Sequence, residues 1–275
     1  MTGTSLQGPR PEGPRLVALD IDGTVLDWGG TIRPDVLDVV GRLRGQGDHI
    51  VMATGRSVIA TVPVARLLGV THGPVVSSNG AVTARLDPGL NGGWGITDLI
   101  TFDPHDALRL IRAELPDALY AVEDVGRGFF VTEPFPENEI DGVHTVVDFE
   151  VLCRTPATRV VIRSPEHTGA DFHAMVQRLG LHEVSYSVGW TAWLDINPQG
   201  VNKASALESV RQHLGVPIER TVAVGDGRND VEMLRWAGRG IAMGDADEVT
   251  QAAADEVTAR HDDGGLALAL ESLLR

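Results

Sequence analysis

Apolar runs alternate with amphipathic segments over the first part of the chain, and this alternation limits the folds that it can adopt. Buried strands are predicted at Leu16–Leu19, at His49–Ala53 and from Val75, with helices between them from Pro34 to about Gly45 and from Ser57 to about Leu68. The order strand-helix-strand-helix-strand is typical of a parallel sheet with right-handed crossovers. We therefore predict an α/β fold built on a parallel sheet.

A different order of predicted elements begins near residue 83 and lasts to about residue 197. The predicted elements there are strands at Ile96–Thr101, Leu119–Glu123, Gly128–Thr132, Thr158–Arg163, Glu183–Val188 and Thr191–Ile196, helices at Pro104–Leu115 and His167–Leu179, and a Pro- and acid-rich linker at Glu133–Asp148. Their order gives two successive β-α-β-β blocks. These blocks indicate a smaller α+β domain inserted into the first fold.

The alternation of helices and strands resumes at Pro198. A helix at Asn202–Leu214, a strand at Thr221–Val224, a helix at Val231–Ala237 and a short strand at Gly240–Met243 are predicted, followed by two closing helical stretches. We therefore expect residues 15–82 and 198–275 to form one core and residues 83–197 to form the inserted domain. Residues 1–14, rich in Gly and Pro, are expected to be a flexible tail.

Polar residues follow three of the predicted core strands at the point where each strand ends. The groups are Asp20, Asp22 and Gly23 after the first strand, Thr54, Gly55 and Arg56 after the second, and Asp226, Asn229 and Asp230 after the strand at Thr221–Val224. In open α/β sheets the carboxyl ends of the strands border one crevice, so we expect these groups to converge. Lys203, in the first turn of the helix that re-enters the core, is expected near the same edge.

Each group also has an ordinary structural interpretation. Asp and Gly are common turn formers, Asn79-Gly80 is a strong hairpin signal, and Asp230 can cap a helix N-terminus. One fact of composition favours a site over these alternatives. Lys203 is the only lysine, so the other 22 of the 23 basic residues are arginines. The one compact ammonium of the chain thus stands where it would suit a phosphoryl oxygen.

These residue types support phosphoryl transfer to a carboxylate. Hard oxygen ligands without a nearby Cys or His cluster favour Mg²⁺ over zinc. A carboxylate nucleophile at Asp20 would form an acyl phosphate, while the Thr54 hydroxyl, the Gly55 amide and the Lys203 ammonium bind the transferred group. Asp22 could protonate the leaving alcohol and then accept a proton from water.

Composition limits the partners and the compartment. The net charge of −15 argues against a protein that binds duplex nucleic acid, because such a protein would present a basic surface. No apolar run reaches membrane-spanning length, and the N-terminal residues lack the apolar stretch of a signal peptide. The single cysteine, Cys153, suits a reducing compartment. We therefore expect a cytoplasmic protein with no nucleic-acid or membrane partner.

Four of these segments resemble the motifs of a known family. DIDGT at Asp20–Thr24, ATGR at Ala53–Arg56, the isolated Lys203 and GDGRND at Gly225–Asp230 are similar to the four motifs of the haloacid dehalogenase superfamily of phosphatases. IAMGDA, AADEVT and DDGG near the C-terminus resemble its Cof-like branch. The insert lies where that branch carries a C2-type (IIB) α+β cap. The resemblance implies a Rossmann-like three-layer core with an inserted cap.

Site roles follow from the resemblance by motif position. It implies a nucleophile, Asp20, an acid/base catalyst, Asp22, and two phosphoryl-binding residues, Thr54 and Lys203. Mg²⁺ would be bound by Asp20, Asp226 and the Asp22 backbone carbonyl, with Asn229 and Asp230 supporting the metal and Lys203. Substrate contacts are expected at Gly55, Arg56, Asn79 and Gly80, the last two in a loop that resembles the SSNGA-type loop of the family.

The sequence therefore predicts a Mg²⁺-dependent phosphatase that hydrolyses small phosphomonoesters, above all sugar phosphates, through an aspartyl phosphate. Two alternatives stay open. A phosphomutase would use the same phosphoaspartate, and a non-catalytic sugar-phosphate sensor would use the same binding residues. The expected partner is a small phosphorylated metabolite, and the expected state is a monomer or a homodimer.

Overall fold

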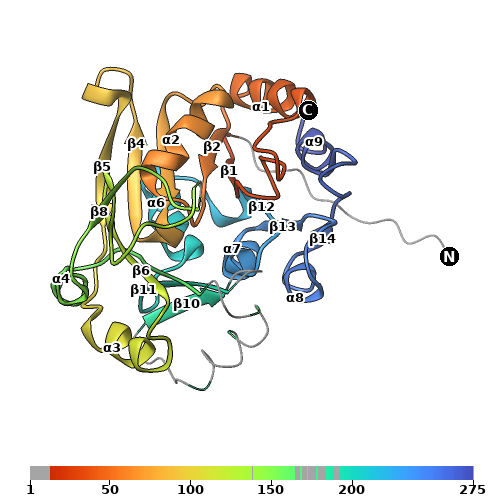
Figure 1. Ribbon diagram of the computed structural model, residues 1–275. Coiled ribbons are helices and arrows are strands. Elements are labelled where there is room, and N and C mark those ends of the chain that lie inside the picture. The colour runs from red at the N-terminus through yellow and green to blue at the C-terminus, as the bar shows by residue number, and fades with distance from the viewer. Residues whose placement is uncertain are drawn as a thin grey trace.

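The computed structural model describes residues 13–137, 139–164, 168, 172, 178, 184–188 and 192–274 (Figure 1). Two predictions lie largely outside these residues: the tail at residues 1–14 and the helix at His167–Leu179. Figure 1 shows a parallel sheet with its helices beside a second sheet that carries the short helices α3 and α4. None of the described helices is long and apolar enough to cross a membrane.

The core contains a five-stranded parallel sheet in the order β14-β13-β12-β1-β2. Its strands are β1 (Leu16–Leu19), β2 (His49–Met52), β12 (Thr221–Gly225), β13 (Arg239–Ala242) and β14 (Glu256–Val257). Strand β1 lies between β2 and β12, and Leu19 pairs with Met52 on one side and with Val224 on the other. The predicted parallel sheet is confirmed, and the strand that precedes the paired aspartates is an inner strand of this sheet.

Helices cover both faces of this sheet. Helices α1 (Pro34–Gly45), α2 (Val58–Leu67) and α9 (Gly265–Glu271) pack with Val17 and Leu19 of β1 on one face. Helices α6 (Lys203–Leu214) and α7 (Val231–Trp236) pack with Leu16 and Ala18 on the other, and the short helix α8 (Glu248–Gln251) follows β13. Since successive side chains of a strand point to opposite faces, β1 serves both layers. The three-layer core is thereby confirmed.

A three-stranded antiparallel sheet, β3-β4-β5, adjoins the core sheet. It contains β3 (Gly73–Ser77), β4 (Val82–Leu86) and β5 (Trp94–Leu99), and β3 meets the end of β2 through a parallel bridge between Ala53 and Val76. The strand predicted at Ile96–Thr101 is β5, and it pairs with β4 instead of with the inserted sheet. The reason is β4, whose Val82 and Leu86 are buried against the core. The division of the chain near residue 82 stays a prediction.

The insert contains a six-stranded sheet in the order β10-β11-β9-β6-β7-β8, antiparallel except for the parallel pair β7 and β8. Its elements are α3 (His105–Glu114), β6 (Leu119–Asp124), β7 (Gly128–Val131), β8 (Val143–Val146), α4 (Phe149–Arg154), β9 (Val160–Arg163), β10 (Val184–Val188) and β11 (Trp193–Pro198). Helices α3 and α4 pack on one face. The linker predicted at Glu133–Asp148 was wrong in part, because it contains β8. This edge strand is mostly exposed and therefore lacks the burial pattern of a core strand.

Candidate active site

The polar groups at the strand ends converge on a buried cluster of carboxylates around Lys203. Carboxylate oxygens of Asp20, Asp226 and Asp230 all lie within 4.8 Å of one another. The Lys203 ammonium donates to Asp20 Oδ1 at 2.5 Å and to Asp230 Oδ1 at 2.7 Å. Lys203 and Asp230 are fully buried, and Asp20 is 5% exposed. The structure thus brings together residues from the ends of β1 and β12 and from the start of α6.

Helix α6 is fixed at the residue that places Lys203. The Asn202 side chain accepts from the Ser205 amide, and the Ser205 hydroxyl in turn contacts the Asn202 backbone amide, which forms a capping box. Lys203 is therefore the first residue of the helix. Gly80 lets the preceding loop approach this end closely, since a Cβ on Gly80 would lie 2.3 Å from the Asn202 carbonyl oxygen. Gly80 was predicted to contact substrate, and the structure places it against α6.

The charges of this cluster do not balance. Burial raises the pKa of Asp20 well above 3.8, and the nearby Asp230 adds to the shift while Lys203 opposes it. Burial and Asp230 likewise raise the pKa of Asp226, to about 7. Burial alone would lower the pKa of Lys203, but its two carboxylate partners outweigh burial and raise it. One cation thus faces two buried carboxylates and one partly buried carboxylate, an excess of negative charge that a divalent cation would offset.

The donor set of the cluster suits Mg²⁺. Among the described residues, this is the one group of His, Cys, Asp and Glu close enough together to hold a metal ion, and all its potential ligands are carboxylate oxygens. Oxygen ligands without nitrogen or sulfur favour Mg²⁺ over zinc. The predicted ligands Asp20 and Asp226 belong to the group. Asp230, predicted to lie behind the metal, belongs to it as well.

The loop after β12 is shaped by Asp230. Its Oδ2 accepts from the backbone amides of Asp226 at 3.1 Å and Gly227 at 2.9 Å, while its Oδ1 accepts from Lys203. The Asp226 carboxylate is held from the other side, because the Thr24 hydroxyl donates to its Oδ1 at 3.0 Å. Asp230 therefore orients both the loop that carries Asp226 and the ammonium of Lys203.

Asp22 lies at the rim of the cluster and is paired with Arg56. The Arg56 guanidinium donates to both carboxylate oxygens of Asp22, at 2.5 and 2.9 Å, and the Asp22 side chain is 49% exposed. This hydrogen bonding raises the pKa of Arg56. From the sequence we expected Asp20 and Asp22 to converge with the other polar groups at one edge of the sheet. The structure places Asp20 inside and Asp22 at the solvent side, with a predicted substrate residue as its partner.

Thr54 and Gly55 follow β2 beside the cluster. Thr54 is 1% exposed, and its hydroxyl accepts from the Arg56 amide at 3.1 Å, so its own proton remains to be donated. Asn79 lies next to Gly55: a Cβ on Gly55 would be 3.1 Å from Asn79 Oδ1. That oxygen accepts from the side chain of Asn229 at 3.1 Å. Asn79 was predicted to contact substrate, and the structure shows it bonded to Asn229.

Two residues with contacts at or near the site, Thr24 and Asn197, were missed from the sequence, and a third residue, Glu123, lies beside them. Thr24 lies in the DIDGT motif, where its spacing from Asp20 could have drawn attention. Asn197 donates from Nδ2 to the carbonyls of Ser78 and Thr158. Glu123, buried in β6, accepts from the Ser78 hydroxyl at 2.6 Å, and burial raises its pKa. Nothing in the local sequence marks Asn197, because its partners lie far away along the chain.

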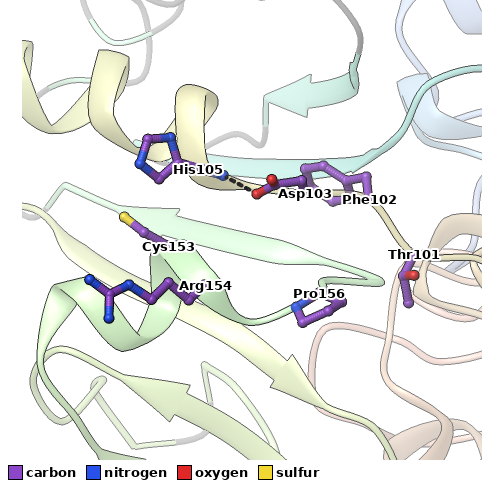
Figure 2. A pocket seen from close by; sticks show the side chains of 7 residues that line it. All are labelled: Thr101, Phe102, Asp103, His105, Cys153, Arg154 and Pro156. Carbon is purple, nitrogen blue, oxygen red and sulfur yellow. Dashed lines mark hydrogen bonds between the residues drawn. The ribbon is translucent and has the colours of Figure 1, made fainter.

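A separate surface pocket lies in the insert (Figure 2). It lies between the segment that enters α3 and the end of α4, has a volume of about 480 Å³, and is lined by Thr101, Phe102, Asp103, His105, Cys153, Arg154 and Pro156. Figure 2 shows Asp103 accepting from the backbone amide of His105 across its upper edge. None of the predicted site residues lines this pocket, so it is distinct from the carboxylate cluster.

Comparison with known proteins places this arrangement in a family. The model of the haloacid dehalogenase-like hydrolases matches residues 17–92 and 117–270. The 5-amino-6-(5-phospho-D-ribitylamino)uracil phosphatase YitU of Bacillus subtilis (strain 168) is 27% identical over 272 residues, which cover 92% of this chain and 95% of that protein.

Solved structures agree with the match. The phosphatase BT1666 of Bacteroides thetaiotaomicron has a TM-score of 0.76 at 27% identity, with 98% of both chains covered. The fold is also shared with the subclass IIB sugar phosphatase BT4131, at a TM-score of 0.78 and 21% identity over 94% of this chain and 98% of the other. The chain therefore belongs to the haloacid dehalogenase-like hydrolases, enzymes that include the phosphatases to which it is similar.

Proposed function

We propose that this hydrolase is a Mg²⁺-dependent phosphatase that cleaves small phosphomonoesters through an aspartyl phosphate on Asp20. The observation that carries the proposal is the buried pairing of the only lysine with Asp20 at the end of β1. A carboxylate held by an ammonium and crowded by two further carboxylates is suited to a site that receives both a metal ion and a phosphoryl group. The names of YitU, a 5-amino-6-(5-phospho-D-ribitylamino)uracil phosphatase, and of BT4131, a sugar phosphatase, agree with this substrate class.

The protein residues divide the work of the reaction. Asp20 Oδ attacks phosphorus while the ester oxygen leaves, so one P–O bond forms as another breaks. Thr54, with its hydroxyl proton free to donate, and Lys203 bind the phosphoryl oxygens where charge develops. Asp22, at the rim, protonates the leaving alcohol and then takes a proton from the water that hydrolyses the acyl phosphate. Arg56, its partner here, would bind the substrate when Asp22 acts.

Mg²⁺ would be held by Asp20, Asp226 and the Asp22 backbone carbonyl, with Asn229 and Asp230 behind it. When bound, the ion supplies positive charge that lets a carboxylate and a phosphate dianion approach each other. Asp230 keeps the Asp226 loop in place for this task, through its bonds to two backbone amides.

The insert, taken as residues 83–197, would serve as the cap that selects the leaving group, while residues 15–82 and 198–275 form the catalytic core. Sugar phosphates are the substrate class that we propose within the small phosphomonoesters. The free, buried thiol of Cys153 agrees with a reducing compartment, and we propose the cytoplasm. A monomer or a homodimer is the proposed state.

Phosphate release from a panel of phosphorylated metabolites tests the proposal. Wild type with Mg²⁺ should release phosphate, and either EDTA or Asp20→Asn should abolish the release. Folded Asp20→Asn that still releases phosphate would refute the aspartyl-phosphate route. If no compound releases phosphate but a sugar phosphate is converted into its isomer, the enzyme is a mutase and not a hydrolase. Binding without either reaction would favour a sensor.

A further inference from the structure

Three asparagine side chains form a continuous hydrogen-bonded chain between the metal-binding loop and the sheet of the insert. Asn229 Nδ2 donates to Asn79 Oδ1 at 3.1 Å, and Asn79 Nδ2 donates to Asn197 Oδ1 at 3.2 Å. Asn197 Nδ2 then donates to the backbone carbonyls of Ser78 at 3.0 Å and Thr158 at 3.1 Å. The chain thus joins three segments that lie far apart in the sequence. We refer to Asn229, Asn79 and Asn197 as the amide relay.

The direction of the amide relay is fixed at its far end. Backbone carbonyls can only accept hydrogen bonds, so Asn197 must turn its NH₂ group toward Ser78 and Thr158. Its oxygen is then left to accept from Asn79, and the oxygen of Asn79 in turn accepts from Asn229. A flip of any one amide would oppose two donors or two acceptors, which is costly for buried groups.

Burial and backbone shape hold the amide relay in place. Asn79 is 6% exposed and Asn197 3% exposed, so water does not compete freely for their bonds. Asn79 has a φ of 52°, in the left-handed region that Asn tolerates better than most residues. Gly55 leaves the space that the Asn79 side chain occupies, because a Cβ there would come within 3.1 Å of Asn79 Oδ1. The local backbone is thus arranged around this one side chain.

The near end of the amide relay reaches the loop that carries Asp226. Because Asn229 turns its NH₂ group toward Asn79, its oxygen lies on the opposite side, where a Cβ on Gly227 would come within 2.6 Å of it. Gly227 lies directly after Asp226, and its amide is one of the two that Asp230 accepts from. The orientation of Asn229 is therefore tied to the part of the loop that presents Asp226.

We propose that Asn79 and Asn197 are positioning residues, which orient Asn229 and the loop at Gly225–Asp230 from the sheet of the insert. Neither residue takes part in the chemistry. Asn197 and Thr158 lie in the insert, whereas Ser78 and Asn79 lie in the core loop after β3, so the amide relay crosses between the two. The strength of Mg²⁺ binding would then depend on an intact contact between core and insert. This inference rests on the proposed Mg²⁺-dependent function.

Magnesium binding by the full-length protein tests the proposal, measured by calorimetry after removal of metal with EDTA. The main variant is Asn197→Asp, which can accept from Asn79 but cannot donate to the two carbonyls. An added negative charge would by itself strengthen cation binding, so weaker binding would report the lost hydrogen-bond direction. The second variant is Asn79→Gly, which carries no charge and tolerates the left-handed backbone. The control is Thr158→Val, which loses a buried bond to Glu123 at the same interface but leaves the amide relay intact.

Each single variant is expected to weaken Mg²⁺ binding about tenfold, as changes behind a metal ligand commonly do, whereas Thr158→Val should bind as wild type does. The Mg²⁺ affinity of the double variant should also fall about tenfold and not about a hundredfold. The reason is that either change alone already interrupts the amide relay, so the two effects do not add. kcat at limiting Mg²⁺ should fall and recover at high Mg²⁺, with KM for the phosphomonoester unchanged.

Wild-type Mg²⁺ affinity in a folded Asn197→Asp or Asn79→Gly variant would overturn the proposal, and so would losses that multiply in the double variant. Hydrogen exchange of the backbone amides at Gly225–Asp230, measured without metal, separates this result from a failure of the proposed function. If the wild-type protein binds no Mg²⁺ but hydrogen exchange in this loop is faster in both variants, the positioning role of the amide relay is supported and the proposed Mg²⁺-dependent function is refuted. Unchanged exchange would overturn the relay in either case.

Discussion

Replacing Asp226 by Asn should stabilise the metal-free protein, by an amount that grows with pH. Burial, together with the Asp230 carboxylate, raises the pKa of Asp226 from 3.8 to about 7. A carboxyl whose pKa is raised on folding binds its proton more tightly in the folded state than in the unfolded one. Its favourable contribution is therefore complete below about pH 4 and is lost as pH rises toward about 7. At about 1.4 kcal/mol per pH unit, ionised Asp226 costs the folded protein ~4 kcal/mol above that pH.

The Asn side chain removes this cost with little other change. It carries no charge at any of these pH values, and its Oδ1 can still accept from the Thr24 hydroxyl, which now donates to Asp226 Oδ1 at 3.0 Å. The gain in unfolding free energy should rise by ~2 kcal/mol between about pH 5.5 and about pH 8, and then level off. Asp20, whose pKa is also raised, adds to the gain because it loses a neighbouring charge.

Thermal unfolding in EDTA across this pH range measures the effect. Asp117→Asn, which changes an exposed carboxylate in the insert, is the control and should show no such trend. Saturating Mg²⁺ should reverse the order, because it stabilises wild type and finds one carboxylate fewer in Asp226→Asn. The reasoning would be refuted by an Asp226→Asn protein that is less stable than wild type at about pH 8 in EDTA, or by a difference that does not change with pH.

Two further changes test the surroundings of the cluster. Lys203→Met leaves Asp20 and Asp230 without their cation, so it should lower the free energy of unfolding by ~3 kcal/mol or more at about pH 8 and abolish phosphate release. The loss should be smaller at lower pH, where Asp20, whose pKa is raised by burial, takes up a proton. Unfolding measured at several pH values checks this, and a loss that is the same at every pH would contradict the reasoning. Gly80→Ala should cost ~2 kcal/mol and lower kcat, because its φ is 102° and the new Cβ would press on the start of α6. Gly200 has a φ of 73°, but a Cβ there would have nothing within 4 Å, so Gly200→Ala should lose only the ~1 kcal/mol of stability due to backbone strain and keep its kcat. Equal effects at both glycines would argue against the steric explanation.

The core could be predicted because its residues obey local rules. Strands β1, β2, β12 and β13 are short and mainly apolar, whereas the exposed β14 is not and was not predicted. Both faces of β1 are buried under helices, which is what a continuous run such as Leu16–Leu19 implies. The charged residues of the site were also visible, since buried charges need partners and Asp20 and Lys203 stand at strand and helix ends. Apolar runs and charged residues at the ends of elements can therefore be recognised from the sequence alone.

The remainder depends on pairing that no local pattern records. Strand β5 pairs with its neighbour in the chain, β4, instead of with the six-stranded sheet, and β8 is an exposed edge strand. Asn197 contacts a side chain 118 positions earlier, and this contact requires the register of β11 against β9. Sequence reasoning finds residues whose chemistry is unusual, but an ordinary asparagine becomes informative only when its neighbours in space are known.

The complete burial of Lys203 has a practical consequence for chemical labelling. Since it is the only lysine and its side chain is 0% exposed, an acylating reagent finds no accessible lysine side chain on the folded enzyme. Modification at this position can occur only after the ammonium has left both Asp20 and Asp230. The rate at which Lys203 is acylated therefore reports how often the catalytic site opens. Mass spectrometry can measure this rate on the single peptide that contains Lys203.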